Sequence, residues 1–342
     1  MEKFLKELLE TPTPSSCEGN GVLIWENKMK NLGLSPYYRD KLGNVGYHIG
    51  TGPKKILLSA HIDEICMSVQ DISDDGYITV ISLCGIDPKI LPGSQVLISD
   101  SEGKNWISRG LFCKQPIHSE DRESRNETIK IEDMRISVGA DSKKDVENLG
   151  IRIGSLVVLD RNINLHFGEN KLHGNGLDDK IGIYIITQIA MRAKKNDNYT
   201  FIFLCACQEE TGLRGMTVAA KNINPDISID IDVTPAIDGD LGVKKEIWGN
   251  IKLGEGCVIE YGPDKSRRIA HILENEKIKT QSCCSPAGGT NTDPIQMFSK
   301  DCETMLISIP NINMHTQNEI CDWRDIESAI DLISGVLNSD KL

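Results

Sequence analysis

The sequence lacks the features that mark a membrane protein or a nucleic-acid-binding protein. No run approaches the ~18 consecutive apolar residues that a membrane-spanning helix needs, and Lys and Arg form no basic stripe. The chain of 342 residues instead carries a formal net charge of −12 at pH 7. We therefore expect neither a membrane nor a nucleic acid among its partners.

Aromatic residues are scarce, at 5%, and the eleven cysteines include no Cys-x-x-Cys pair. The scarcity of aromatic side chains argues against a sugar-binding platform, and so against a cellulase. An odd number of cysteines in a long chain favours thiols in a reducing compartment over a disulfide framework. The first residues predict an amphipathic helix ended by Pro12 and Pro14 rather than a signal peptide. We expect a cytoplasmic protein.

The pattern of apolar residues differs between two parts of the chain. In 1–67 and 169–342, apolar runs alternate with helical patterns, which predicts an α/β domain with a mixed, largely parallel sheet flanked by helices. The stretch 68–168 instead holds short β-like pieces separated by turn signals such as Leu-Pro-Gly-Ser. We predict a small β-rich domain inserted at 68–168. A single irregular domain is the alternative.

Four apolar runs of the predicted α/β domain are nearly unbroken, which is typical of strands in a sheet buried on both faces. They are 54–60, 199–207, 226–232 and 304–310. In open α/β sheets, ligands gather at the carboxyl ends of the strands. Each run is followed closely by histidine or acidic residues, so we expect a site at this edge.

Seven residues at these strand ends, or at the start of the predicted helix 181–195, are candidates for the site. They are His61, Asp63, Asp178, Glu209, Glu210, Asp232 and His315. Taken singly, each has an ordinary alternative, such as a surface charge or a helix cap. Together they supply a bridging acid, two further ligands for each of two metals, and a spare carboxylate. That set is what metal-assisted hydrolysis requires.

Charge and geometry support this interpretation. Asp178, Glu210 and Asp232, with a bound hydroxide, would neutralise two divalent ions. Neighbouring side chains on an extended backbone point different ways. One member of the Glu209–Glu210 pair can therefore bind a metal while the other acts as a base. A carboxylate inside an apolar strand, such as Asp232, is costly unless it is paired or metal-bound.

The segments HIDEI, GLDDKIG, QEETGLRG and IDIDVTPA resemble the co-catalytic metallo-aminopeptidases of the glutamyl-aminopeptidase and tetrahedral (TET) aminopeptidase family. Their order and spacing hold over nearly the whole chain, and QEETGLRG is the most specific of them. The resemblance implies a zinc-exopeptidase-like α/β domain with an inserted small β-barrel of the PDZ-like kind. It also implies a homo-oligomer, a dimer at least and a tetrahedral dodecamer.

The resemblance assigns the metal ligands. It implies two divalent ions per subunit, zinc or cobalt. Asp178 would bridge both ions, and His61 and Asp232 would complete one site. Glu210 and His315 would complete the other.

The resemblance also assigns two catalytic acids and an activity. Glu209 would be the general base, and Asp63 would hold the imidazole of His61 in place. The implied enzyme is an aminopeptidase that acts on short peptides with a free N-terminus. Cys66 stands where the family has glycine, and a thiol so close to the site would add either a ligand or a position open to oxidation.

Two alternatives use the same residues. A related di-metal carboxypeptidase, dipeptidase or deacylase also has an acid pair and a bridging Asp. Its inserted domain is α/β, however, and the β texture of 68–168 argues against it. A metal-binding scaffold without catalysis is the remote alternative. Such a protein would have no need of the spare carboxylate, Glu209.

Overall fold

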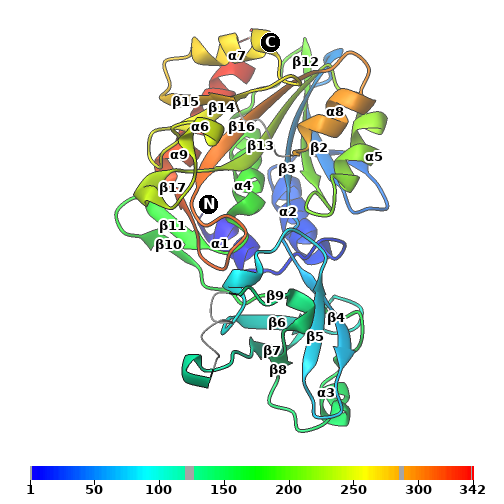
Figure 1. The fold of residues 1–342 in the computed structure, drawn as a ribbon. Helices are drawn as coiled ribbons and strands as arrows, with labels where there is room; N and C mark the ends of the chain where they lie inside the picture. Colours follow the sequence, from blue (N-terminus) through cyan, green and yellow to red (C-terminus); the bar gives the residue numbers. More distant parts are fainter. Residues whose placement is uncertain (1, 120–126, 285–288, 340) are drawn as a thin grey trace. The chain divides into compact units, whose positions relative to one another are not determined.

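The computed structural model describes residues 2–119, 127–284, 289–339 and 341–342, which form two compact units (Figure 1). The first unit comprises Met1–Glu64, Asn162–Met314 and Asn318–Leu342. The second comprises Ile65–Arg161 and His315–Gln317. The chain therefore leaves the first unit directly after the segment that carries His61 and returns to it nearly a hundred residues later.

An eight-stranded sheet forms the centre of the first unit, in the order β1-β2-β12-β3-β13-β16-β14-β15. The strands are β1 (Ser35–Arg39), β2 (Val45–Ile49), β3 (Lys54–His61), β12 (Tyr199–Ala206), β13 (Ile227–Pro235), β14 (Cys257–Tyr261), β15 (Thr280–Cys284) and β16 (Glu303–Asn311). Strands β12, β3, β13 and β16 run parallel to their neighbours in this set, whereas β2 and β14 border the set antiparallel. The four apolar runs are thus the parallel centre of a mixed sheet, as predicted.

Helices cover both faces of this sheet (Figure 1). One face packs against α1 (Glu2–Glu10), α2 (Gly19–Asn31), α4 (Leu177–Arg192), α7 (Arg267–Glu274) and α9 (Trp323–Leu337), and the other against α5 (Arg214–Ile223) and α8 (Thr292–Phe298). Alternate residues of β3 enter the two cores, Leu58 and Ala60 on one side and Leu57 on the other. Burial of both faces explains why the strand has no polar alternation.

The rest of the first unit comprises a short helix, α6 (Lys245–Trp248), and a three-stranded sheet of β10 (Asn164–Phe167), β11 (Lys171–Gly174) and β17 (Glu319–Asp322). Among the helices in the described part of the chain, none combines the length and apolar content needed to cross a bilayer.

The second unit is built on a closed barrel with the strand order β4-β5-β8-β7-β6-β9. Its strands are β4 (Met67–Ile72), β5 (Ile78–Ser82), β6 (Gln95–Ser99), β7 (Trp106–Phe112), β8 (Ile136–Ser137) and β9 (Leu156–Leu159), and it also holds α3 (Lys143–Asn148). Alternating residues such as Ile78 and Val80 fill its core. The strand β10, which lies within 68–168, pairs with β11 in the first unit. The insertion at 68–168 stays a prediction. Likeness to a PDZ domain stays a prediction.

A buried ion pair joins three segments of the first unit close to the end of β3. Lys180 is fully buried, and its Nζ lies 3.4 Å from Oε1 of Glu64 and donates to the carbonyl oxygen of Thr11 at 2.9 Å. The same Glu64 oxygen accepts the N–H of Thr13 at 2.6 Å. Glu64 and Lys180 belong to the segments HIDEI and GLDDKIG. The pair therefore holds the backbone around His61 close to the start of α4.

Removing one partner of a buried ion pair leaves the other charge buried without compensation. We expect Lys180→Met to lower the free energy of unfolding by about 3–5 kcal/mol. The double variant Lys180→Met/Glu64→Gln should recover part of that loss, because the uncompensated charge is gone. Urea denaturation followed by circular dichroism measures both variants. A double variant no more stable than Lys180→Met would show that charge pairing is not what stabilises this junction.

Candidate active site

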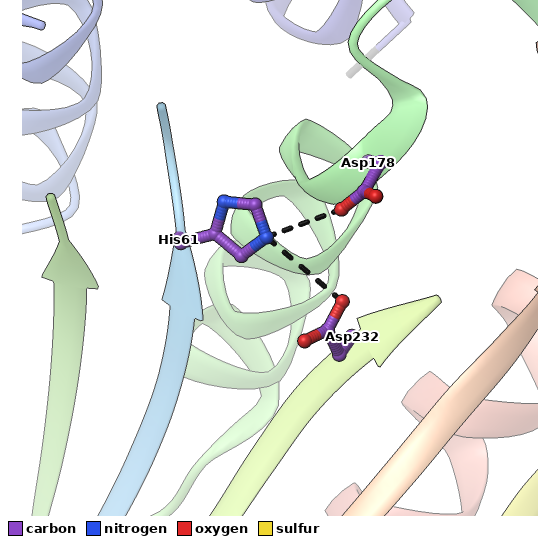
Figure 2. A group of neighbouring side chains, drawn as sticks. All are labelled: His61, Asp178 and Asp232. Carbon is purple, nitrogen blue, oxygen red and sulfur yellow. Dashed lines mark ion pairs between the residues drawn. The ribbon is translucent and has the colours of Figure 1, made fainter. Parts of the chain in front are cut away.

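The parallel register of the central strands aligns the residues of the site. His61, the last residue of β3, pairs with Ala206 of β12, and Ser59 pairs with Asp230 of β13. The carboxyl ends of the strands therefore lie at one edge of the sheet, where α4 begins. Figure 2 shows the side chains of His61, Asp178 and Asp232 converging there from β3, α4 and β13.

The three side chains form a buried set of ligand atoms. Nε2 of His61 lies 3.1 Å from Oδ1 of Asp178 and 3.9 Å from Oδ1 of Asp232 (Figure 2). One ligand atom from each of the three residues lies within 4.8 Å of the others, and all three residues are buried. An imidazole nitrogen with two carboxylate oxygens is a donor set that suits zinc or cobalt. The residues therefore fit a divalent cation.

A third acid, Glu209, adds further negative charge close to His61. Its Oε2 lies 4.0 Å from Nε2 of His61. Burial raises the pKa of Glu209 well above its usual range, and the carboxylate of Asp232 raises it further. Burial likewise raises the pKa of Asp232, with Asp178 adding to the shift. A cation among these carboxylates would lower their pKa values again, because it stabilises the ionised forms.

The same acids also raise the pKa of the His61 imidazole. Burial lowers the pKa of His61, but Glu209 and Asp178 raise it by more, so that the net shift is well upward. The surrounding acids therefore favour the protonated form of the ring. A divalent ion would supply the positive charge instead and leave the imidazole neutral, as metal ligation requires.

Asp63 holds the backbone of the acid pair. Its fully buried carboxylate accepts the N–H of Glu209 at 2.9 Å and that of Glu210 at 3.1 Å. It also accepts the hydroxyl of Ser15 at 2.5 Å. Nδ1 of His61 lies 3.1 Å from the carbonyl oxygen of Asp63 and 3.5 Å from its carboxylate. The residue therefore contacts His61 mainly through its backbone and fixes the Glu209–Glu210 turn with its side chain.

Three residues that make contacts at the site were not among the predicted site residues. Asp179, near the start of α4, accepts the N–H of Gly182 at 3.0 Å, and its other oxygen accepts the N–H of His61 at 3.2 Å. The N–H of Asp178 donates to Glu319 at 2.9 Å. Ser15 is the third such residue, and its hydroxyl donates to the carboxylate of Asp63. Of these three residues, only Asp179 could have been suspected from the sequence. It stands next to Asp178 in GLDDKIG, and capping a helix requires only one of two adjacent acids.

The remaining predicted ligands lie in different units. Glu210 follows Glu209 in the first unit. His315 belongs to the second unit, where its Nδ1 lies 2.9 Å from the carbonyl oxygen of Gly85. A second metal site made by Glu210 and His315 stays a prediction.

Comparison with known proteins gives a consistent result. A family model described as M42 glutamyl aminopeptidase matches residues 43–332. The lysyl aminopeptidase of Pyrococcus furiosus is 30% identical over 349 residues, covering 99% of this chain and 97% of that protein. Among solved structures, the TET aminopeptidase from the marine sediment archaeon Thaumarchaeota archaeon SCGC AB-539-E09 matches with a TM-score of 0.91 and 25% identity, covering 100% of this chain and 96% of that one. The Pyrococcus horikoshii TET1 peptidase matches with a TM-score of 0.83 and 25% identity, covering 98% of each chain.

The matched range includes His61, Asp178, Glu209 and Asp232, which the structure brings together. The resemblance seen in the motifs is therefore confirmed. The chain belongs to the M42 glutamyl aminopeptidase family and is a metal-dependent aminopeptidase.

Proposed function

We propose that the chain binds two divalent ions, zinc or cobalt, and removes N-terminal residues from short peptides at the site around His61. The observation that carries the proposal is the convergence of His61, Asp178 and Asp232 with a further acid, Glu209, whose carboxylate lies 4.0 Å from the imidazole. A purely structural metal site needs ligands but no additional carboxylate. Glu209 therefore argues against the scaffold alternative.

In this proposal, His61 and Asp232 hold one ion, Glu210 and His315 hold the other, and Asp178 contacts both. The distances among His61, Asp178 and Asp232 support the first set. The order of the motif residues along the sequence supports the second set. All five residues offer the nitrogen and oxygen donors that zinc and cobalt accept.

The bound ions and the side chains of the site would have separate roles in the reaction. When bound, the ions would lower the pKa of water and polarise the scissile carbonyl. Glu209 would accept the proton of the attacking water and deliver it to the leaving amine. Burial suits Glu209 to this exchange, because it raises the pKa and so favours a carboxyl that can hold the proton between the two steps. Asp63 would keep Glu209 and Glu210 in their separate directions by bonding both backbone N–H groups.

We also propose that the chain forms a homo-oligomer, a dimer at least and a dodecamer in its complete form. The Pyrococcus horikoshii TET1 peptidase can assemble into a tetrahedron or a large octahedral shell. A charge of −12 per chain opposes such packing unless the interfaces are apolar or charge-paired. The exposed side chains of Ile117 and Ile153 supply apolar surface in the second unit. A cytoplasmic location is part of the proposal, since all eleven cysteines are thiols in the structure.

Glu209→Gln tests the assignment of the base. The amide cannot take a proton, so turnover should fall by about 10²–10⁴-fold while both ions stay bound. Metal content by mass spectrometry and hydrolysis of an aminoacyl chromogenic substrate would be measured on the same sample. The adjacent Glu210→Gln is the matched control, and it should lose metal. If Glu209→Gln strips an ion, or retains nearly full activity, the two glutamates have been assigned the wrong way round.

Blocked peptides test which end of the substrate is recognised. Acetylation removes the positive charge of the α-amine and a group able to bind a metal, but leaves the scissile bond intact. Loss of two polar contacts of about 1–3 kcal/mol each lowers the rate by several orders of magnitude. A free tetrapeptide should therefore be shortened from its first residue, and its N-acetyl form should be nearly inert. C-terminal amidation serves as the control and should matter little.

Mass spectrometry of the products over time identifies the end that shortens. Residues leaving from the carboxyl end, or equal cleavage of the acetylated peptide, would support the carboxypeptidase, dipeptidase or deacylase alternative instead.

A further inference from the structure

Two cysteines of the second unit lie next to each other at the open end of the β4–β5 hairpin, Cys66 just before β4 and Cys84 just after β5. The Sγ atoms of Cys66 and Cys84 are 4.0 Å apart. Backbone pairing holds the two segments together, because Leu83 donates its N–H to the carbonyl oxygen of Cys66 at 3.0 Å and Met67 pairs with Ser82. The pairing of β4 with β5 therefore keeps the two thiols close together.

The two thiols differ in exposure. Cys66 is fully buried, whereas Cys84 is partly exposed. An oxidant in solution would therefore reach Cys84 first and find a second thiol directly behind it. A sulfur–sulfur bond is about 2.05 Å long, so the two sulfurs must approach by about 2 Å. Rotation of the side chains with a small shift of the loop after β5 would supply that movement.

We propose that Cys66 and Cys84 are an oxidation site that closes to a disulfide in the presence of hydrogen peroxide. The sulfur of Cys84 attacks one peroxide oxygen, the O–O bond breaks, and a sulfenic acid and one water form. The sulfur of Cys66 then displaces the hydroxyl of the sulfenic acid, which leaves as a second water once it has taken a proton. The two thiols together lose two electrons and two protons, and the peroxide is reduced to two waters.

Formation of the disulfide would also affect the contact that His315 makes with Gly85, the residue after Cys84. Gly85 follows Cys84 directly, and its carbonyl oxygen lies 2.9 Å from Nδ1 of His315. That contact fixes which ring nitrogen carries the proton and how the ring is oriented. Drawing Cys84 toward Cys66 would displace the carbonyl. A loss of activity follows only if His315 has its proposed role as a metal ligand, whereas formation of the disulfide does not depend on that role.

The test uses the full-length enzyme, treated with hydrogen peroxide and then alkylated to block the remaining thiols. Mass spectrometry of a non-reduced digest should find the Cys66 peptide joined to the Cys84 peptide. The kcat/KM for an aminoacyl chromogenic substrate should fall by about tenfold or more, as expected when a site residue is misplaced by about 1 Å. Activity should return after reduction, removal of the reductant and re-addition of metal.

Variants that each replace one cysteine identify the two residues that form the disulfide. Cys84→Ser and Cys66→Ala should each resist inactivation and form no cross-link. Cys113→Ser, which alters an exposed cysteine of the same unit, should be inactivated like the unaltered enzyme. Absence of the cross-linked peptide, or inactivation of Cys84→Ser as fast as the unaltered enzyme, would overturn the inference.

The result also separates this inference from the proposed function. A disulfide that forms without any change in kcat/KM would refute the link to His315. An unoxidised enzyme that hydrolyses no peptide would instead count against the proposed function, and the cross-link would still decide whether the two thiols pair.

Discussion

The packing of carboxylates around one imidazole is the constraint on which the rest of the site depends. Asp178, Glu209 and Asp232 are all held close to His61, and each side chain is at most 10% exposed to solvent. Burial and mutual repulsion raise the pKa values of Glu209 and Asp232, so the protein without a cation favours protonated acids. A divalent ion reverses that preference and releases protons as it binds. Metal binding and the ionisation of the acids are therefore one process.

The fold supplies this arrangement through the register of parallel strands. Because β3, β12 and β13 end at the same edge of the sheet, residues far apart in the sequence meet without any long loop. Asp63 then sets the finer geometry, since its carboxylate bonds the N–H groups of both Glu209 and Glu210. Lys180 and Glu64 tie the same region to the start of α4. Asp63, Glu64 and Lys180 are themselves buried, which limits how far the acids can move apart.

Much of this could be predicted from the sequence, because apolar runs that end in His61 or Asp232 leave few places for the charged groups to lie. The hydroxyl of Ser15 on Asp63 could not be predicted, since the two residues meet only in the folded chain. The β-strand pattern of 164–167 likewise could not identify the strand with which this segment pairs. It shows that a strand forms but not which sheet the strand joins, and β10 joins β11 rather than the barrel. Periodicity reports burial, whereas pairing depends on tertiary contacts.

Anomalous X-ray diffraction from crystals grown with zinc tests the central claim most directly. The account predicts two peaks about 3.5–4 Å apart in each subunit. One should lie about 2.0–2.2 Å from Nε2 of His61 and from carboxylate oxygens of Asp178 and Asp232. The other should contact Asp178 and Glu210, and Glu209 should bind neither ion. A map with no peak among His61, Asp178 and Asp232, or with Glu209 as a ligand in place of Asp232, would contradict the account.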